Sequence, residues 1–140
     1  MYILGISCYY HDAAACILKD GELIAASAEE RFSRIKHDSG FPRLSIDFCL
    51  KMAGITAQDV DYVVFYEKPL LKFERILLTA LGTYPRSLTM FRESMIAWFN
   101  EKLWIKTHLR DELGIEDRKL LFVEHHLSHA ASAFFASPYK

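Results

Sequence analysis

The sequence predicts an α/β domain with a mixed sheet, and three observations lead to this prediction. Strand-like segments of small and β-branched residues crowd the first thirty positions and recur twice later in the chain. Segments with helical spacing of apolar residues separate the later strands. Of the 140 residues 51% are hydrophobic, so a chain of this size can bury roughly 65 to 70% of its unfolded surface. The order β-β-β-α-β, then a helix-rich stretch, then β-α, is typical of one α/β domain.

The first three strands form a predicted β-meander. Residues 2–8 and 13–18 have strand length and are rich in small or β-branched side chains. The Asp20-Gly21 pair then favours a type I′ hairpin, because both central residues of that turn need positive φ. Residues 22–28 (ELIAASA) close the meander.

The later elements are predicted from spacing and helix-end signals. Apolar residues at i, i+3, i+4 and i+7 within 42–53, followed by Gly54, indicate an amphipathic helix. Residues 62–66 (YVVFY) and 119–123 (KLLFV) are the fourth and fifth strands. The unbroken apolar character of the fifth strand predicts that it is covered on both faces.

A helical insert, residues 68–118, is predicted between the fourth and fifth strands. Apolar and aromatic side chains recur there at helical spacing. They are Leu88, Phe91, Met95 and Trp98, with Phe99, Leu103 and Trp104 beside them. Two interpretations remain open: the helices pack on the sheet as part of the core, or they expose an aromatic surface to a partner or second domain.

Composition argues against several partners and compartments. The 17 basic and 18 acidic residues nearly balance, so neither nucleic acid nor a membrane surface is an expected partner. Cys8, Cys16 and Cys49 have no CxxC spacing, which argues against a disulfide framework or zinc ribbon. No signal-peptide pattern and no uncharged stretch of roughly 18 residues is present. A soluble, unexported protein of the reducing cytoplasm is expected.

Residues 124–132, EHHLSHAAS, hold three of the six histidines. On a helix, His125 and His129 would point the same way, with about 5 to 6 Å between their Cβ atoms. Two imidazoles at this spacing can share a metal ion if further donors come from elsewhere. His126 stands where HExxH peptidases carry a glutamate, which argues against peptidase chemistry. Helix capping or hydrogen bonding within the core is the alternative role.

A second candidate site is the tip of the first hairpin, from Gly5 to Ala13. Backbone N–H groups and Ser7 could bind a phosphate or carboxylate there, because a glycine in a strand permits close approach of another group. His11 and Asp12 could do acid–base work. An ordinary turn with Asp12 as a local cap fits the same spacing.

A third candidate site is the charged segment 29–38. Arg31, Arg34, Lys36 and His37 could together form an anion site. A solvated surface segment is the alternative, since the neighbouring acidic residues would pair with these bases on any surface.

These stretches in combination resemble a known family. Residues 3–42 (ILGISCYYHDAAACILKDGELIAASAEERFSRIKHDSGFP) and 123–139 (VEHHLSHAASAFFASPY) resemble the N-terminal part of the carbamoyltransferases that modify nodulation factors and antibiotics. That family is similar to the tRNA threonylcarbamoyl-transfer enzymes, with the ribonuclease H-like core of the actin-like ATPase superfamily. The resemblance implies carbamoyl transfer from carbamoyl phosphate, with ATP and through carbamoyl-adenylate, to a hydroxyl of a small-molecule acceptor.

The resemblance also implies roles for the matching residues. His125 and His129 would ligate a divalent metal ion, with iron the expected metal, and His126 would lie beside the substrate or behind the metal ligands. Asp12 and His11 would lie in the transfer site, with His11 as the base that takes the acceptor proton. Phosphate contact is the implied role of Arg31, Lys36 and His37.

Family members are several times longer than this chain. Residues 1–140 would then be a partial N-terminal carbamoyltransferase domain, half of an actin-like fold. The other half, with most of the adenosine pocket and a further acidic metal ligand, would come from a C-terminal part or second domain. Two alternatives remain: a non-catalytic interaction module of the same fold, or an ATPase or phosphotransferase relative, which would have no need of the HHxxH histidines.

Overall fold

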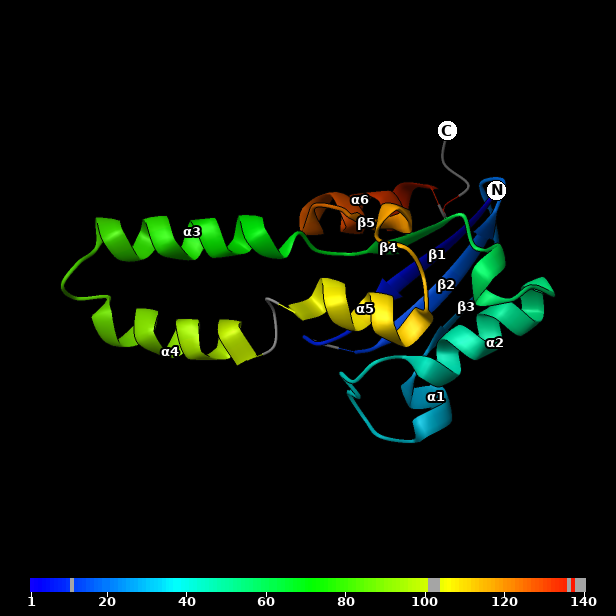
Figure 1. The fold of residues 1–140 in the computed structure, drawn as a ribbon, viewed down its shortest axis with the longest axis horizontal. Coiled ribbons are helices and arrows are strands. Elements are labelled where there is room, and N and C mark those ends of the chain that lie inside the picture. Colours follow the sequence, from blue (N-terminus) through cyan, green and yellow to red (C-terminus); the bar gives the residue numbers. More distant parts are fainter. Residues whose placement is uncertain (11, 101–103, 136, 138–140) are drawn as a thin grey trace.

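The computed structural model describes residues 1–10, 12–100, 104–135 and 137, and shows a five-stranded mixed sheet with helices (Figure 1). The strands are β1 (Tyr2–Ser7), β2 (Ala14–Lys19), β3 (Glu22–Ala28), β4 (Tyr62–Phe65) and β5 (Leu120–Phe122). The helices are α1 (Glu30–Ser33), α2 (Arg43–Ala53), α3 (Pro69–Gly82), α4 (Leu88–Asn100), α5 (Ile105–Leu113) and α6 (His125–Phe135). The α/β class predicted from the sequence is confirmed.

The first three strands form the predicted antiparallel meander. β1 pairs with β2 from Tyr2 opposite Lys19 to Ser7 opposite Ala14, and β2 pairs with β3. Asp20 and Gly21 have φ of 52° and 91°. Both values are positive, as a type I′ turn requires.

The remaining strands, β4 and β5, run parallel to β1, in the order β3-β2-β1-β4-β5. The carboxyl ends of β1, β4 and β5 therefore meet at one edge of the sheet. β5 is an outer strand, and Leu121 is 44% exposed. The prediction that β5 is covered on both faces is wrong, because only Leu120 and Phe122 belong to the core side and Leu121 faces the other way.

The core lies between one face of the sheet and the helices α2 and α5. Ile17 and Phe65 of the sheet are fully buried, together with Cys49 of α2 and Leu109 of α5. α2 ends as predicted at Gly54, whose left-handed φ of 67° lets its N–H return to the last helical carbonyls.

A buried carboxylate holds the start of α2. Pro42 precedes the helix and offers no side-chain cap. Glu29, which is only 5% exposed, instead accepts the N–H groups of Leu44 and Ser45 at 3.0 and 2.7 Å. These donors have no intrahelical acceptor, so Glu29 joins the end of β3 to α2.

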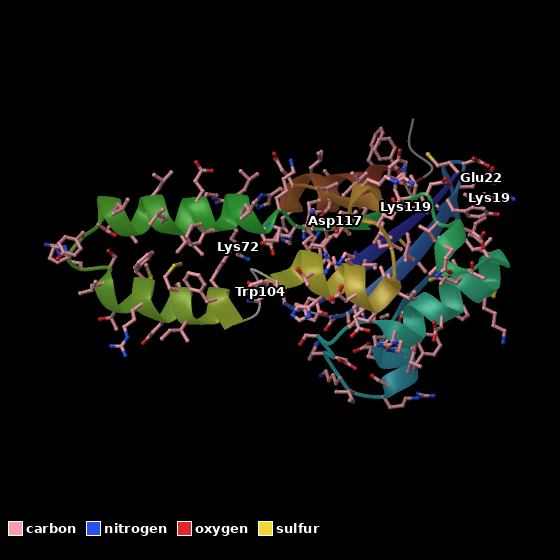
Figure 2. The ribbon with its side chains drawn as sticks, in the orientation of Figure 1. Lys19, Glu22, Lys72, Trp104, Asp117 and Lys119 are labelled. Atoms are coloured by element: carbon pink, nitrogen blue, oxygen red, sulfur yellow. The ribbon has the colours of Figure 1, made fainter. Side chains whose placement is uncertain are left out.

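The insert divides into a hairpin and a core helix. α3 and α4 project from the sheet and pack on each other through Phe73 and Trp98, whose ring centroids are 4.8 Å apart (Figure 1). Trp104 follows the hairpin (Figure 2). Its Nε1 donates to the carbonyl of Phe99 at 3.1 Å. α5 packs on the sheet, as the first interpretation predicts, whereas α3 and α4 leave apolar side chains exposed. A partner or second domain for this exposed surface stays a prediction. Leu103 lies outside the described residues.

None of the described helices has the length and apolar character needed to cross a membrane.

Candidate functional site

The candidate site lies where the carboxyl ends of the three parallel strands meet. β1 leads into residues 8–10, β4 into Tyr66 and Glu67, and β5 into Glu124 and α6. In open α/β sheets this edge is the usual place for a ligand site, because loops with free side chains meet there over a rigid frame.

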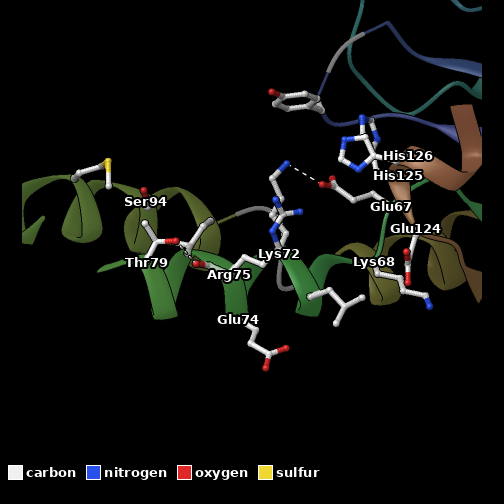
Figure 3. Close-up of a pocket in the computed structure, with 14 residues that line it drawn as sticks. Glu67, Lys68, Lys72, Glu74, Arg75, Thr79, Ser94, Glu124, His125 and His126 are labelled. Atoms are coloured by element: carbon white, nitrogen blue, oxygen red, sulfur yellow. Dashed lines mark hydrogen bonds and ion pairs between the residues drawn. The ribbon is translucent and has the colours of Figure 1, made fainter. Parts of the chain in front are cut away.

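A pocket of about 690 Å³ opens at this edge, between the strand ends and the helical hairpin (Figure 3). Its inner end is formed by side chains that follow the strands, and its outer wall by α3 and α4. The polar lining residues are Tyr10, Glu67, Lys68, Lys72, Glu74, Arg75, Thr79, Ser94, Glu124, His125 and His126. Acidic and basic groups are both present, so the pocket suits a ligand with charged and hydroxyl groups.

The first turn of α6 carries the histidine pair. The predicted helix begins at His125, and this places His125 and His129 on one face. Their Nε2 atoms are 3.2 Å apart and their ring centroids 4.6 Å apart. Tyr66 packs edge-on against His125, with ring centroids 5.6 Å apart. The predicted convergence of these two imidazoles is therefore observed.

The pair fits two ligands of one metal ion. With metal–nitrogen bonds of 2.0 to 2.1 Å, two ligand nitrogens lie roughly 3.0 to 3.4 Å apart. Partial burial lowers the pKa of His125, and the neighbouring His129 lowers it further, against an opposing effect of Glu67. A lowered pKa keeps the imidazole neutral near pH 7, which is the form that binds metal.

The pair is not a complete metal site in the part of the chain that is described. No group of three or more His, Cys, Asp or Glu side chains there is arranged to hold an ion. The Nδ1 atom of His125 is buried without a hydrogen-bond partner among these residues, although ligating histidines ordinarily donate from their second nitrogen. These two imidazoles alone would therefore leave a metal ion short of ligands.

An ion pair joins the inner end of the pocket to the hairpin. Lys72 Nζ of α3 lies 2.8 Å from Glu67 Oε1 and 4.5 Å from the ring centroid of Tyr10. Figure 3 shows this contact beside His125 and His126. Lys72 thus contacts both the β1 and the β4 ends of the sheet.

The hairpin tip brings Asp12 against the charged segment. Asp12 Oδ1 lies 2.9 Å from Nδ1 of His37, and the Asp12 carbonyl accepts Ser7 Oγ at 3.4 Å. The predicted His11–Asp12 pair is not testable, because His11 lies outside the described residues. The histidine that contacts Asp12 is His37, for which the resemblance implies a phosphate contact.

The other predicted phosphate contacts do not line this pocket. Arg31 lies in α1 and Lys36 in the following loop, and both are exposed. The loop is nevertheless tied to the hairpin tip, since Tyr9 and Ala13 donate their N–H groups to the carbonyls of Ser39 and Asp38 at 2.7 and 2.6 Å. Arg31 and Lys36 therefore belong to a separate surface that is joined to the tip by backbone hydrogen bonds.

Gly5 serves packing within the sheet. A Cβ atom at this position would lie 2.7 Å from Sγ of Cys16, its partner on β2. The close approach inferred from a glycine in a strand is thus present, but the approaching group is a cysteine of the neighbouring strand.

Sequence reasoning missed most of the pocket. Glu67 and Lys72 received no role, and neither did Arg75 or Glu124. A usable signal existed for Glu67 and Glu124, because each follows an apolar strand within two residues. Recognising that the two strands are parallel would have placed both carboxylates at one edge. Lys72 and Arg75 depend on the direction in which α3 leaves the sheet, which no local pattern specifies.

Fold and site together define an α/β domain with a ligand pocket at the carboxyl edge of its parallel strands. The family model described as the carbamoyltransferase N-terminus matches residues 2–140. The chain therefore belongs to the carbamoyltransferase N-terminus family, as the resemblance of its motifs predicts.

Two curated relatives match almost the whole chain. Uncharacterized protein sll1178 of Synechocystis sp. is 56% identical over 145 residues, which cover 99% of this chain and 24% of the relative. Nodulation protein NolNO of Sinorhizobium fredii is 35% identical over 137 residues, which cover 94% of this chain and 18% of the relative. The chain thus spans about a quarter or less of the length of these relatives.

Among solved structures, component A of the (R)-2-hydroxyglutaryl-CoA dehydratase of Acidaminococcus fermentans is 28% identical, with a TM-score of 0.36. The match covers 46% of this chain and 24% of that one. So small an overlap does not define the fold.

Proposed function

We propose that residues 1–140 form the N-terminal module of a metal-dependent carbamoyltransferase. The module works together with a C-terminal part or second domain like the one that the longer relatives have room for. The reaction transfers a carbamoyl group from carbamoyl phosphate, with ATP and through carbamoyl-adenylate, to a hydroxyl of a small-molecule acceptor. A cytoplasmic location is part of the proposal and agrees with three free cysteines.

The observation that carries the proposal is the position of the histidine pair. In a chain of this family, His125 and His129 lie together at the carboxyl edge of the sheet, and His125 lines a pocket large enough for a small molecule. The strand order and directions also support a ribonuclease H-like core of the actin-like ATPase type.

His125 and His129 would hold the metal ion, with iron the expected species and a further ligand from the missing part. When bound, the ion would act as a Lewis acid toward a carbamoyl or phosphate oxygen. His126, whose side chain lines the same pocket, would contact the substrate.

The tip of the first hairpin would supply acid–base chemistry. Asp12 accepts a hydrogen bond from Nδ1 of His37 when that nitrogen is protonated, which leaves Nε2 as the basic atom. His11 remains the candidate base for the acceptor proton, with Asp12 and Ser7 beside it in sequence. Arg31 and Lys36 would contact phosphate only if the missing part extends the site toward their loop.

A chimaera tests the proposed function. The matching segment of the Synechocystis relative is replaced by this chain, and pyrophosphate release from ATP is measured with and without carbamoyl phosphate. We expect carbamoyl-phosphate-dependent release that falls at least a hundredfold in the His125→Ala/His129→Ala variant. Lys51→Ala, exposed on α2, is the control and should retain activity.

A second measurement separates the metal site from the reaction. Iron and zinc content and affinity are determined for this chain and for the double variant. Metal that binds the chain and is lost in the variant supports a preformed ligand pair. An active chimaera whose rate does not depend on the two histidines would contradict their assigned role.

A second candidate function is a non-catalytic interaction module. It is favoured by the exposed apolar side chains of the α3–α4 hairpin. A chimaera that folds, binds metal in neither form and releases no pyrophosphate would favour this alternative.

A further inference from the structure

The α3–α4 hairpin has three distinct sides. The two helices contact each other on one side, where Trp98 and Ala80 are buried. A second side lines the pocket with Lys72, Thr79 and Ser94. Each helix thus uses one side for the other helix and one side for the pocket. The exposed residues of both helices lie on the third side.

That remaining side is apolar and follows the same spacing on both helices. On α3 it consists of residues at i, i+4, i+8 and i+11, and α4 repeats the pattern. We call this surface the outer stripe: Leu70, Glu74, Leu78 and Leu81 on α3, and Leu88, Arg92, Ile96 and Phe99 on α4. Its six apolar side chains are between 53% and 70% exposed. A contiguous apolar surface of this kind marks an interaction site.

The two charges in the outer stripe are opposite in sign and symmetrically placed. Glu74 lies four residues from Leu70, at the base of the hairpin, and Arg92 lies four residues from Leu88, at its tip. With a rise of 1.5 Å per residue, Glu74 lies about 6 Å from the base end of the stripe, and Arg92 lies about 6 Å from its tip end. Neither side chain has an ion-pair partner among the described residues. Glu74 also borders the pocket, and Figure 3 shows its side chain directed to the side of α3 opposite Lys72.

We propose that the outer stripe is the interface of a homodimer, in which two hairpins stack tip to base about a two-fold axis and form a four-helix bundle. This arrangement brings Glu74 of each copy level with Arg92 of the partner copy, so the same pair forms twice, as an isologous contact requires. The complementary positions of the two charges favour a second copy of this chain over an unrelated partner.

The base of the hairpin offers a place for the tip of the other copy. A groove of about 350 Å³ lies there, lined by Leu70, Leu71, Trp98 and Phe122 among others. Tyr84, at the turn between α3 and α4, is 68% exposed and would face this groove in a tip-to-base dimer. If each of the six apolar side chains buries on the order of 100 Å² in the dimer, the buried area approaches the roughly 800 Å² per partner of a standard interface.

Sedimentation and light scattering at micromolar concentration test the proposal. We expect a mass of twice the 16.2 kDa of one chain. Leu78→Glu should weaken the dimer at least tenfold, because it places a charge in the centre of the outer stripe. Leu23→Glu is the matched control: Leu23 is 57% exposed on β3 against 61% for Leu78, and its substitution should leave the dimer intact.

A charge exchange gives an independent test that leaves every apolar contact in place. Glu74→Arg and Arg92→Glu should each weaken the dimer, and the double variant should restore it. A chain that is monomeric at these concentrations would overturn the proposal and leave the outer stripe to a segment of a longer protein. A dimer that tolerates Leu78→Glu, or one that the double exchange fails to restore, would also overturn it.

Discussion

The sheet leaves no room for a side chain at Gly5. Any Cβ atom there would meet Cys16 Sγ at 2.7 Å, closer than carbon and sulfur can approach. Cys16 has few ways to yield, because its short side chain lies between two paired strands. The need for glycine is therefore steric and arises from one neighbouring residue.

We predict that Gly5→Ala lowers the free energy of unfolding by about 1 to 3 kcal/mol, the usual cost of overpacking. Urea denaturation measures it. Cys16→Ala should recover most of the loss in the double variant, since it removes the atom that clashes. A loss that is unchanged by Cys16→Ala would mean that backbone conformation sets the requirement.

The pKa values of all three thiols are raised. Burial raises the pKa of Cys8 to about 12 and that of Cys49 to about 11, and it also raises the pKa of Cys16. The thiolate is the reactive form. Cys8 and Cys49 therefore behave as small apolar side chains of the core, and Cys16 is a weakly reactive, partly buried thiol.

We predict that Cys8 reacts with iodoacetamide at pH 8 about a thousandfold more slowly in the folded chain than in guanidinium. The factor follows from a rise of the pKa from 9.0 to about 12. Because the pKa is raised, the folded-state rate should keep increasing about tenfold per pH unit above pH 9, where an ordinary thiol levels off. Mass spectrometry identifies the labelled residue, and equal rates in both states would contradict the prediction.

At the scale of elements, the start of α2 depends on a residue outside the helix. Glu29 supplies the acceptor that Pro42 cannot, and it does so while almost fully buried. Its negative charge also lies at the positive end of the helix dipole. The crossing from β3 to α2 is thereby fixed.

We predict that Glu29→Ala lowers the free energy of unfolding by about 1 to 3 kcal/mol, because two buried N–H groups lose their acceptor. Chemical denaturation measures the change. Glu22→Ala, a substitution of an exposed glutamate on β3, should cost less than about 0.5 kcal/mol. A similar cost for both variants would show that the loss of a negative charge, and not the loss of the two hydrogen bonds, is responsible.

Elements with local signals were predictable from the sequence. The Asp20-Gly21 turn needs positive φ at both residues, and Gly54 ends α2 by its own conformation. β5 was misjudged, because an apolar run does not reveal whether a strand lies inside a sheet or at its edge. The cap by Glu29 was also out of reach, since it joins residues 15 and 16 positions apart.

At the scale of the whole molecule, the candidate site also combines contacts within one element, which the sequence predicts, and contacts between elements, which it does not. His125 and His129 could be paired from the sequence because one helical turn brings them together. Asp12 meets His37 across 25 positions, and the contact of Glu67 with Lys72 depends on the direction in which α3 leaves the sheet. Such contacts between elements depend on how the α3–α4 hairpin and the loops are attached to the sheet.

Lys72 is the polar link in that mounting, and its removal should loosen the hairpin. Lys72→Met keeps the length and apolar contacts of the side chain but leaves Glu67, whose side chain is 12% exposed, without its ion-pair partner. We predict a loss of about 1 to 2 kcal/mol in the local stability of α3, so that its amides exchange about 5 to 30 times faster. Hydrogen exchange with mass spectrometry measures this, with α2 as the internal reference that should not change.

Lys68→Met, one turn earlier at the helix start, is the matched control and should leave exchange in α3 within twofold. Equal acceleration in α2 and α3 would mean that Lys72 supports the whole domain, and that the hairpin is held to the sheet by its apolar contacts.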